Sequence, residues 1–130
     1  MALLALSGCY PYGPPEKANV PADFPVYPGA VPTSQVYGAA SPLPDGSKDR
    51  RERYDITWSS DDSAGKLLAY YKVQLAQGDW VTQSTSETGH GGELIVFNRK
   101  SDPKFGGTIY LADRRIHVIM GQDCPCGAPN

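Results

Sequence analysis

The amino-acid sequence predicts an α+β domain, in which one helix packs on one face of a mostly antiparallel sheet of four to five strands. Two observations predict this fold class. Polar and apolar residues alternate without a break at 53–58, and apolar residues recur at steps of three and four at 64–75. Strand-like segments then follow the helix at the spacing of hairpins. A chain of 130 residues is long enough for one such core and too short for two.

The first predicted strand covers residues 53–58. Side chains on a strand point alternately to opposite faces, so Tyr54, Ile56 and Trp58 are expected to be buried together on one face. The preceding residues 38–50 combine prolines, an Asp-Gly pair and a charged run. This composition indicates an exposed loop before the strand.

The predicted helix begins after residues 59–63, which supply hydroxyl and carboxylate oxygens for the free N–H groups of a first turn. Its apolar stripe consists of Ala64, Leu67, Leu68, Tyr71 and Leu75. Asp61 and Asp62 are interpreted as capping charges at the positive end of the helix, and not as an acid–base pair. Gly78 is expected to cap the other end.

Four more strands are predicted after the helix, at residues 80–86, 93–99, 108–111 and 115–120. Segment 93–99 is apolar on both faces in its middle, so we expect it to lie centrally in the sheet. The Gly-rich residues 88–92 are interpreted as a hairpin loop. Together these elements place the α+β domain at residues 23–121, followed by an irregular tail at 122–130 that contains two cysteines.

The N-terminal residues resemble the end of a signal peptide. Apolar residues dominate positions 1–8, and Leu6-Ser7-Gly8-Cys9 resembles the lipobox of bacterial lipoproteins, in which a peptidase cleaves just before a cysteine that carries acyl chains such as palmitate. The resemblance implies that residues 1–8 are removed and that Cys9 is lipidated. A full signal peptide also has a basic segment before its apolar core, so we expect the natural start to lie further upstream. The alternative is an apolar N-terminus with an ordinary thiol.

Proline dominates the chain between this cysteine and the domain. Nine of the 12 prolines fall in the first 44 residues, where they disfavour a helix or a central strand by removing backbone donors. Residues 9–22 are therefore expected to form a Pro-rich, extended tether between lipid and domain. Residues 24–30 concentrate aromatic and aliphatic side chains between turns, and we expect them to pack on the core.

Short motifs along the domain resemble those of a loose group of uncharacterised bacterial envelope proteins. They are Tyr27-Pro28-Gly29-Ala30, the helix start Ser60-Asp61-Asp62-Ser63, the pair Tyr70-Tyr71 and the turn Gly78-Asp79-Trp80. The resemblance covers roughly residues 23–120 and implies the same fold and an envelope location. This sequence departs from the group's Gly-Trp pattern by inserting Asp79. The group has no agreed activity, so the resemblance implies no catalytic residue.

Charge and motif content exclude several classes of function. Twelve Lys and Arg against 14 Asp and Glu leave a net charge of -2, so the chain lacks the cationic field that nucleic-acid binding requires. No apolar run reaches the roughly 18 residues of a membrane-spanning helix. No nucleophile elbow, zinc-protease motif, phosphate-binding loop or dinucleotide fingerprint is present in the sequence. The sequence therefore predicts neither a nucleic-acid partner nor a cofactor.

The remaining candidate thiols are Cys124 and Cys126, which a single proline separates. In an oxidising compartment we expect them to form a disulfide, either with each other or with a partner protein, with metal binding or redox catalysis as the alternatives. A structural zinc site needs four ligands, and only His90 and His117 remain to complete one. These histidines fall in a predicted loop and a predicted strand, so no metal site is predicted.

His117 has a second possible role. Asp55 could orient it across neighbouring strands, as a carboxylate orients a catalytic imidazole. The hydroxyls near Asp55 in the sequence are Thr57, Ser59 and Ser60, and none of them lies in a recognisable nucleophile motif. We therefore assign no catalytic residue from the sequence.

The sequence thus predicts a lipid-anchored cell-envelope protein that acts as a non-enzymatic binding or assembly module. Its expected partners are the membrane, through the N-terminal lipid, and other envelope proteins. Tyr10 replaces the aspartate that favours inner-membrane retention of lipoproteins in enteric bacteria, so we expect the outer membrane of the envelope, facing the periplasm or the outside, over the inner one. The alternative is an envelope enzyme, either a thiol-dependent redox enzyme that uses Cys124 and Cys126 or a hydrolase that uses His117.

Overall fold

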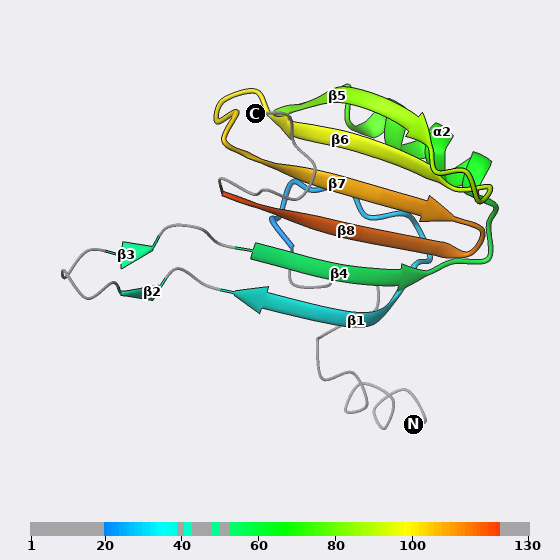
Figure 1. The fold of residues 1–130 in the computed structure, drawn as a ribbon, viewed down its shortest axis with the longest axis horizontal. Helices are drawn as coiled ribbons and strands as arrows, with labels where there is room; N and C mark the ends of the chain where they lie inside the picture. Colours follow the sequence, from blue (N-terminus) through cyan, green and yellow to red (C-terminus); the bar gives the residue numbers. More distant parts are fainter. Residues whose placement is uncertain (1–19, 39–40, 43–47, 50–52, 123–130) are drawn as a thin grey trace.

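The computed structural model describes residues 20–38, 41–42, 48–49 and 53–122 of the chain. Its main feature is a six-stranded antiparallel sheet with the strand order β1-β4-β8-β7-β6-β5 (Figure 1). The helix α2 connects β4 to β5, which lies at the far edge of the sheet. The elements are β1 (Val31–Gly38), β2 (Ser41–Pro42), β3 (Lys48–Asp49), β4 (Arg53–Ser59), α2 (Ala64–Gln74), β5 (Trp80–Glu87), β6 (Glu93–Arg99), β7 (Phe105–Ala112) and β8 (Arg115–Gln122).

The α+β class is confirmed, but the predicted sheet of four to five strands is wrong because the sheet has six. The additional strand is β1, an edge strand that pairs with β4. Pro32 argues against a central strand but is tolerated at an edge, where one side of the backbone has no partner strand. The β1–β4 ladder shifts its register between Pro32 and Ser34. The expected loop at 38–50 also contains the short pair β2–β3.

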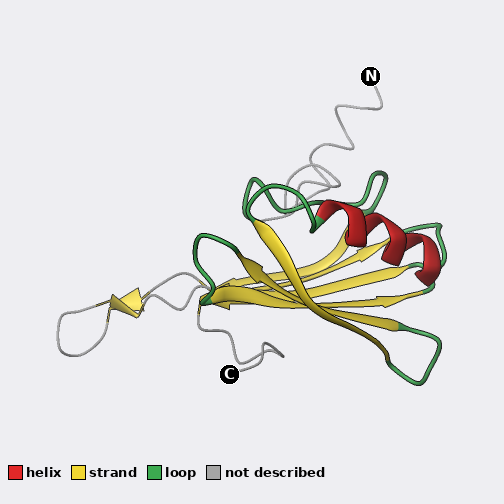
Figure 2. Cartoon of the chain, turned by 90° about the horizontal axis from the view of Figure 1, so that it is seen from above, coloured by secondary structure: helices red, strands yellow, loops and turns green. Residues whose placement is uncertain are grey.

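The two faces of the sheet differ in what covers them. Tyr54, Ile56 and Trp58 of β4 share a face, as predicted, and Ile56 and Trp58 are fully buried there while Tyr54 is half-buried. Helix α2 packs on this covered face and lies on one side of the sheet only (Figure 2). Phe24 and Ala30 join the same core, which confirms the predicted packing of residues 24–30. Val20, which was assigned to the tether, also packs against this core. The opposite face, called the open face below, carries no helix in the described part of the chain.

Two hydrogen bonds fix the start of α2. Ser63 is the N-cap, and its Oγ accepts from the backbone N–H of Lys66 at 3.4 Å. The Oδ1 atom of Asp113, in the turn between β7 and β8, accepts from the backbone N–H of Ala64 at 2.9 Å. The predicted helix start is therefore confirmed, but Asp61 and Asp62 were wrongly assigned as its caps. The carboxylate that accepts a hydrogen bond from the helix start, that of Asp113, comes from a distant turn, which sequence spacing does not reveal.

The end of α2 also differs from the prediction. The helix ends at Gln74 with Leu75 as its C-cap, so Gly78 is not the cap. Gly78 instead has a φ of 62° in the turn that leads into β5. Glycine adopts this left-handed backbone conformation without the steric cost that a Cβ brings. Gly78 therefore marks the turn that follows the helix, and not the end of the helix itself.

Aromatic side chains form the centre of the core on the covered face. The Phe24 and Trp80 rings meet edge to face at 5.7 Å with an interplanar angle of 89°, and the Trp80 and Phe97 rings lie 5.6 Å apart. Tyr71 of α2 is also fully buried and lies 6.3 Å from the Phe24 ring. Edge-to-face pairs add about 0.5–1.5 kcal/mol beyond area burial. The core therefore joins the N-terminal segment, the helix and the sheet.

Arg99, the last residue of β6, ties the N-terminal segment to the sheet. Its guanidinium contacts both carboxylate oxygens of Asp23, at 2.6 and 2.8 Å, and Oδ2 of Asp79 at 3.3 Å. It also stacks 4.2 Å from the Trp80 ring, whose Nε1–H donates to the Asp23 carbonyl at 3.0 Å. The bidentate hydrogen bonds from Arg99 hold the pKa of Asp23 below its usual value. Hydrogen bonds from Ser101, together with Arg99, also hold the pKa of Asp79 below its usual value.

These lowered pKa values predict that the domain loses stability in acid. The unfolded chain binds protons at the ordinary aspartate pKa of 3.8, whereas the folded chain binds them only at lower pH. The free energy of unfolding should therefore fall as the pH drops below about 4. Urea unfolding measured between pH 6 and pH 2 checks this. The variant Asp23→Asn should show a shallower acid dependence, while Asp61→Asn, an exposed aspartate outside the Arg99 contacts, should keep the original slope.

Candidate functional site

The candidate site lies on the open face, at the centre of the sheet. Ile56 and Trp58 point to the covered face, so Asp55 and Thr57 of β4 point to the open face. The register of each pair of strands then shows which residues of the other strands point to the same face. The side chains of the open face used below are Val36, Asp55, Thr57, Leu94, Val96, Thr108, Tyr110, His117 and Ile119.

A histidine–carboxylate contact lies in the middle of this face. The Nε2 atom of His117 on β8 is 2.7 Å from Oδ1 of Asp55 on β4. The His117 side chain is 25% exposed and that of Asp55 is 52% exposed, so both can be reached by a ligand. The proposed orientation of His117 by Asp55 is therefore seen in the structure. The contact is diagonal across the β4–β8 ladder, in which His117 faces Thr57 and Asp55 faces Ile119.

Tyr110 of β7 extends this cluster on its other side. Tyr110 faces His117 directly in the β7–β8 ladder, and the two rings lie 5.7 Å apart with an interplanar angle of 31°. The tyrosine is 38% exposed. Sequence reasoning did not include Tyr110, because the order of the strands decides its distance from Asp55. The alternation of Ile109, Tyr110 and Leu111 is the signal that could have placed Tyr110 on the opposite face from its two apolar neighbours.

The hydroxyls considered as nucleophiles are not assembled into a catalytic set. A general base must lie within about 2.6–3.2 Å of the proton that it removes. The side chain of Ser60 is used in the turn after β4, where its Oγ accepts from the backbone N–H of Asp62 at 3.2 Å. Thr57 faces His117 in the ladder, but the hydrogen bonds of the described residues do not join their side chains. The site can bind through hydrogen bonds and ring stacking.

The other candidate residues lie apart from this cluster or outside the described residues. His90 is exposed in the loop between β5 and β6, where Gly89 and Gly91 have φ values of 86° and 78°. These left-handed conformations confirm the hairpin loop predicted at 88–92. Cys9, Cys124 and Cys126 lie outside the residues that the structure describes. Within the described residues, no group of three or more His, Cys, Asp or Glu side chains is placed to hold a metal ion.

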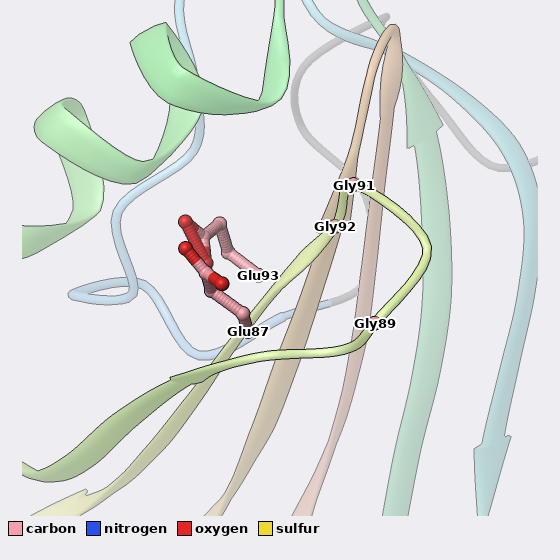
Figure 3. Close-up of a pocket in the computed structure, with 5 residues that line it drawn as sticks. All are labelled: Glu87, Gly89, Gly91, Gly92 and Glu93. Carbon is pink, nitrogen blue, oxygen red and sulfur yellow. The ribbon is translucent and has the colours of Figure 1, made fainter.

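A pocket of about 270 Å³ lies beside the same hairpin loop, and sequence reasoning missed it. Glu87 and Glu93 face each other in the β5–β6 ladder, and Figure 3 shows their side chains lying side by side in this pocket. Like charges directly opposite each other on a sheet are destabilising. Calcium takes six to eight oxygen ligands and magnesium demands near-octahedral geometry. Two carboxylates fall short of either set, so we assign no metal centre here.

A second pocket, of about 310 Å³, lies between the N-terminal segment and the turn after α2. Its acidic side chains, Asp23 and Asp79, are both held by Arg99. Trp80 and Pro25 form part of its wall. The carboxylates that line this pocket are therefore part of the contact between the N-terminal segment and the sheet.

Comparison of the chain with family models, with curated proteins and with solved structures finds no match. In the part of the chain that the structure describes, no helix is both long enough and apolar enough to cross a membrane.

Proposed function

We propose that this protein is a lipid-anchored module of a bacterial cell envelope that acts by binding and not by catalysis. The observation that carries the binding role is the open face of the sheet. The covered face of the sheet is already packed, because α2 and residues 20–30 lie against it. The open face instead leaves Val36 69% exposed and Tyr110 partly exposed beside the His117–Asp55 contact.

The composition of the open face supports this proposal. Antiparallel sheets with one solvated face usually present polar residues there. Here the outward positions of the interior strands include Leu94, Tyr110 and Ile119, which are apolar or aromatic and are exposed or half-buried. Apolar surface rimmed by polar residues marks interaction sites in many proteins. The open face is therefore the surface that we assign to binding.

The anchor is proposed from the lipobox-like sequence before Cys9. Each buried methylene of an acyl chain contributes about 0.8 kcal/mol, and two chains give stable membrane attachment where one gives reversible contact. The part of the predicted tether that precedes Val20 would then hold the domain away from the bilayer, because Val20 itself packs against the core. The absence of aspartate after Cys9 favours the outer membrane over the inner one.

Intact-mass measurement of the native, membrane-extracted protein tests the anchor. We expect a mature N-terminus at Cys9 with the added mass of acyl chains, and sedimentation with outer-membrane fractions. The variant Cys9→Ser should lose both the cleavage and the membrane fractionation. A native form that still carries residues 1–8 and a free thiol at Cys9 would contradict the anchor.

Site-specific cross-linking in living cells tests the binding surface. A photo-reactive amino acid at position 110, on the open face, should give a reproducible adduct with one envelope component. The same residue at position 73, which is exposed on α2, is the matched control and should give none. Equal adducts from both positions, or none from position 110, would remove the open face as the binding surface.

The 2.7 Å contact between His117 and Asp55 favours a second candidate function, that of an envelope hydrolase. It requires His117 to act as a general base on a hydroxyl or a water. Hydrolysis of p-nitrophenyl esters by the wild type and by His117→Gln separates the two candidates. Equal rates for both proteins leave the binding role, whereas a large loss in the variant supports the hydrolase.

A further inference from the structure

The edge strand β1 concentrates exposed apolar side chains. In the described part of the chain five large apolar side chains are exposed, and three of them lie on this strand: Val31, Val36 and Tyr37. Val36 is the most exposed of the five, at 69%. Strand β1 is the last strand of the sheet, and Figure 1 shows no further described strand beyond it. Exposed apolar side chains and an open strand edge therefore occur together.

The second half of β1 lacks the features that protect the edges of sheets. An edge strand directs a row of backbone N–H and C=O groups away from its sheet, and proteins usually protect this row with charged side chains, proline or a bulge. The first half of β1 has such protection, because it contains Pro32 and the register shift between Pro32 and Ser34. Residues 34–38 pair regularly with β4 and contain neither a proline nor a charged side chain. This half of β1 can therefore accept another strand.

The opposite edge of the sheet, β5, has a different character. Its exposed side chains, at residues 83–87, are all polar or charged. The β5–β6 ladder also shifts its register between Thr82 and Ser84, in the middle of β5. A bulge of this kind bends an edge strand and interrupts regular pairing. Of the two edges, β1 is therefore the one suited to extend the sheet.

The sequence of β1 is compatible with pairing to a second copy of itself. A two-fold axis brings the same surface of both copies together, so a charge near the axis would meet a like charge. None of the eight residues of β1 is charged. In an antiparallel pair centred on Val36, this residue faces itself on the open face, and Tyr37 faces Gln35 of the other copy on the covered face. This register uses residues 34–38 of both copies and leaves Pro32 outside the pair.

The charge on the neighbouring strand does not oppose this arrangement. Asp55 of β4 faces Val36 in the β1–β4 ladder, so it lies one strand inside the edge. In the paired sheet the two Asp55 side chains would lie three strand spacings apart, which is about 14 Å at about 4.8 Å for each spacing. This distance exceeds the Debye length of about 8 Å at physiological ionic strength. Repulsion between the two carboxylates is therefore largely screened.

We propose that two copies of this chain pair antiparallel through the edge of β1, with Val36 on the two-fold axis. The axis is perpendicular to the sheet, so both copies of α2 lie on the same side and the two open faces form one continuous surface. A seam of five residues on each strand is small beside the standard interface of about 1,600 Å². We therefore expect a weak dimer, with a Kd on the order of 10–100 µM. The pairing depends neither on the lipid anchor nor on what the open face binds.

Sedimentation equilibrium of the full chain at about 5–500 µM tests the pairing. The parent protein carries Cys9→Ser, Cys124→Ser and Cys126→Ser, so that neither acyl chains nor disulfides link two copies. Its average mass should rise with concentration from that of one chain toward that of two. Val36→Lys places two like charges at the axis and should keep the chain monomeric throughout. Thr85→Lys, at an exposed position of β5, is the matched control and should associate as the parent does.

Disulfide cross-linking locates the axis. Facing residues of an antiparallel pair have Cα atoms about 4.5–5.5 Å apart, within the range of about 4.4–6.8 Å that a disulfide spans. In the parent protein, Val36→Cys should therefore form a covalent dimer when oxidised glutathione is added. The matched control is Ser34→Cys, which is also exposed and lies on the same face of the same strand. In the proposed register position 34 faces Gly38 of the other copy, so this variant should form little covalent dimer.

Three outcomes would overturn the proposal. The first is a parent protein that stays monomeric at every concentration, or an association that Val36→Lys leaves unchanged. The second is an association that Thr85→Lys abolishes and Val36→Lys does not, which would place the dimer at β5. The third is equal cross-linking of the Ser34→Cys and Val36→Cys proteins, which would show that the axis does not pass through Val36. Thermal unfolding shows whether each variant folds, and the cross-linking of Val36→Cys decides the matter if Val36→Lys is unfolded.

Discussion

Replacing Phe97 with alanine is expected to lower the free energy of unfolding by about 3–5 kcal/mol. Phe97 is fully buried on β6, and its ring lies 5.7 Å from that of Phe24 and 5.6 Å from that of Trp80. The alanine would remove the ring that joins the N-terminal segment to the sheet and would leave a cavity between rigid aromatic neighbours. Urea unfolding followed by tryptophan fluorescence and by far-UV circular dichroism measures the loss.

The matched control for Phe97→Ala is Val73→Ala on the outer side of α2. Val73 is 56% exposed, so this change should alter the unfolding free energy by less than about 0.5 kcal/mol. A loss below about 1 kcal/mol in Phe97→Ala would show that the aromatic cluster closes around the cavity. The interpretation of Phe97 as the centre of the core would then be wrong.

Replacing Gly107 with alanine should destabilise the domain about as much as Phe97→Ala does. Phe97→Ala leaves a cavity, whereas Gly107→Ala adds an atom where there is no space for it. A Cβ at this position of β7 would lie 2.0 Å from the carbonyl oxygen of Ile119 and 2.6 Å from Cα of Met120. Both atoms belong to the backbone of β8, which cannot move away without disturbing the β7–β8 ladder. We expect a loss of about 3 kcal/mol or more, at the upper end for overpacking. Thermal and urea unfolding of the purified variant measure it.

Gly65→Ala is the matched control for Gly107→Ala, and its effect should have the opposite sign. Gly65 lies in α2, and the nearest atom to an added Cβ is Oγ of Ser63 at 4.0 Å. Alanine there should increase the unfolding free energy by about 0.5–1 kcal/mol, because glycine loses more backbone freedom on folding. Equal stability of the Gly107→Ala and Gly65→Ala proteins would show that β7 and β8 do not approach as closely as the structure places them.

The same close approach explains why the sequence misplaced the start of β7. The strand was predicted to begin at residue 108, because residues 100–106 were interpreted as a turn. In the structure β7 begins at Phe105 and both glycines are inside it. Glycine within a strand often marks a site of close backbone approach. The two glycines are visible in the sequence, but whether they indicate a turn or a close approach of two strands depends on the partner strand.

The candidate site was predicted only in part. Asp55 and His117 were considered together because each lies on a predicted strand, and the structure brings them into contact. Tyr110 was missed, and the pair Glu87 and Glu93 was missed as well. In each case the residues meet across a hairpin that the sequence predicts, but the periodicity of a strand does not fix the register in which its partner faces it.

From β4 onward, local patterns in the sequence by themselves determined the type of each element and most of the bounds. Alternation placed a strand at 53–58 and the structure has it at Arg53–Ser59, and segment 93–99 matches β6 at both ends. Only the tertiary structure decided that β8 lies between β4 and β7, and so that Asp55 meets His117 across 62 residues of chain. Side-chain periodicity is a property of neighbours along the chain, whereas strand order depends on how all the elements share one core.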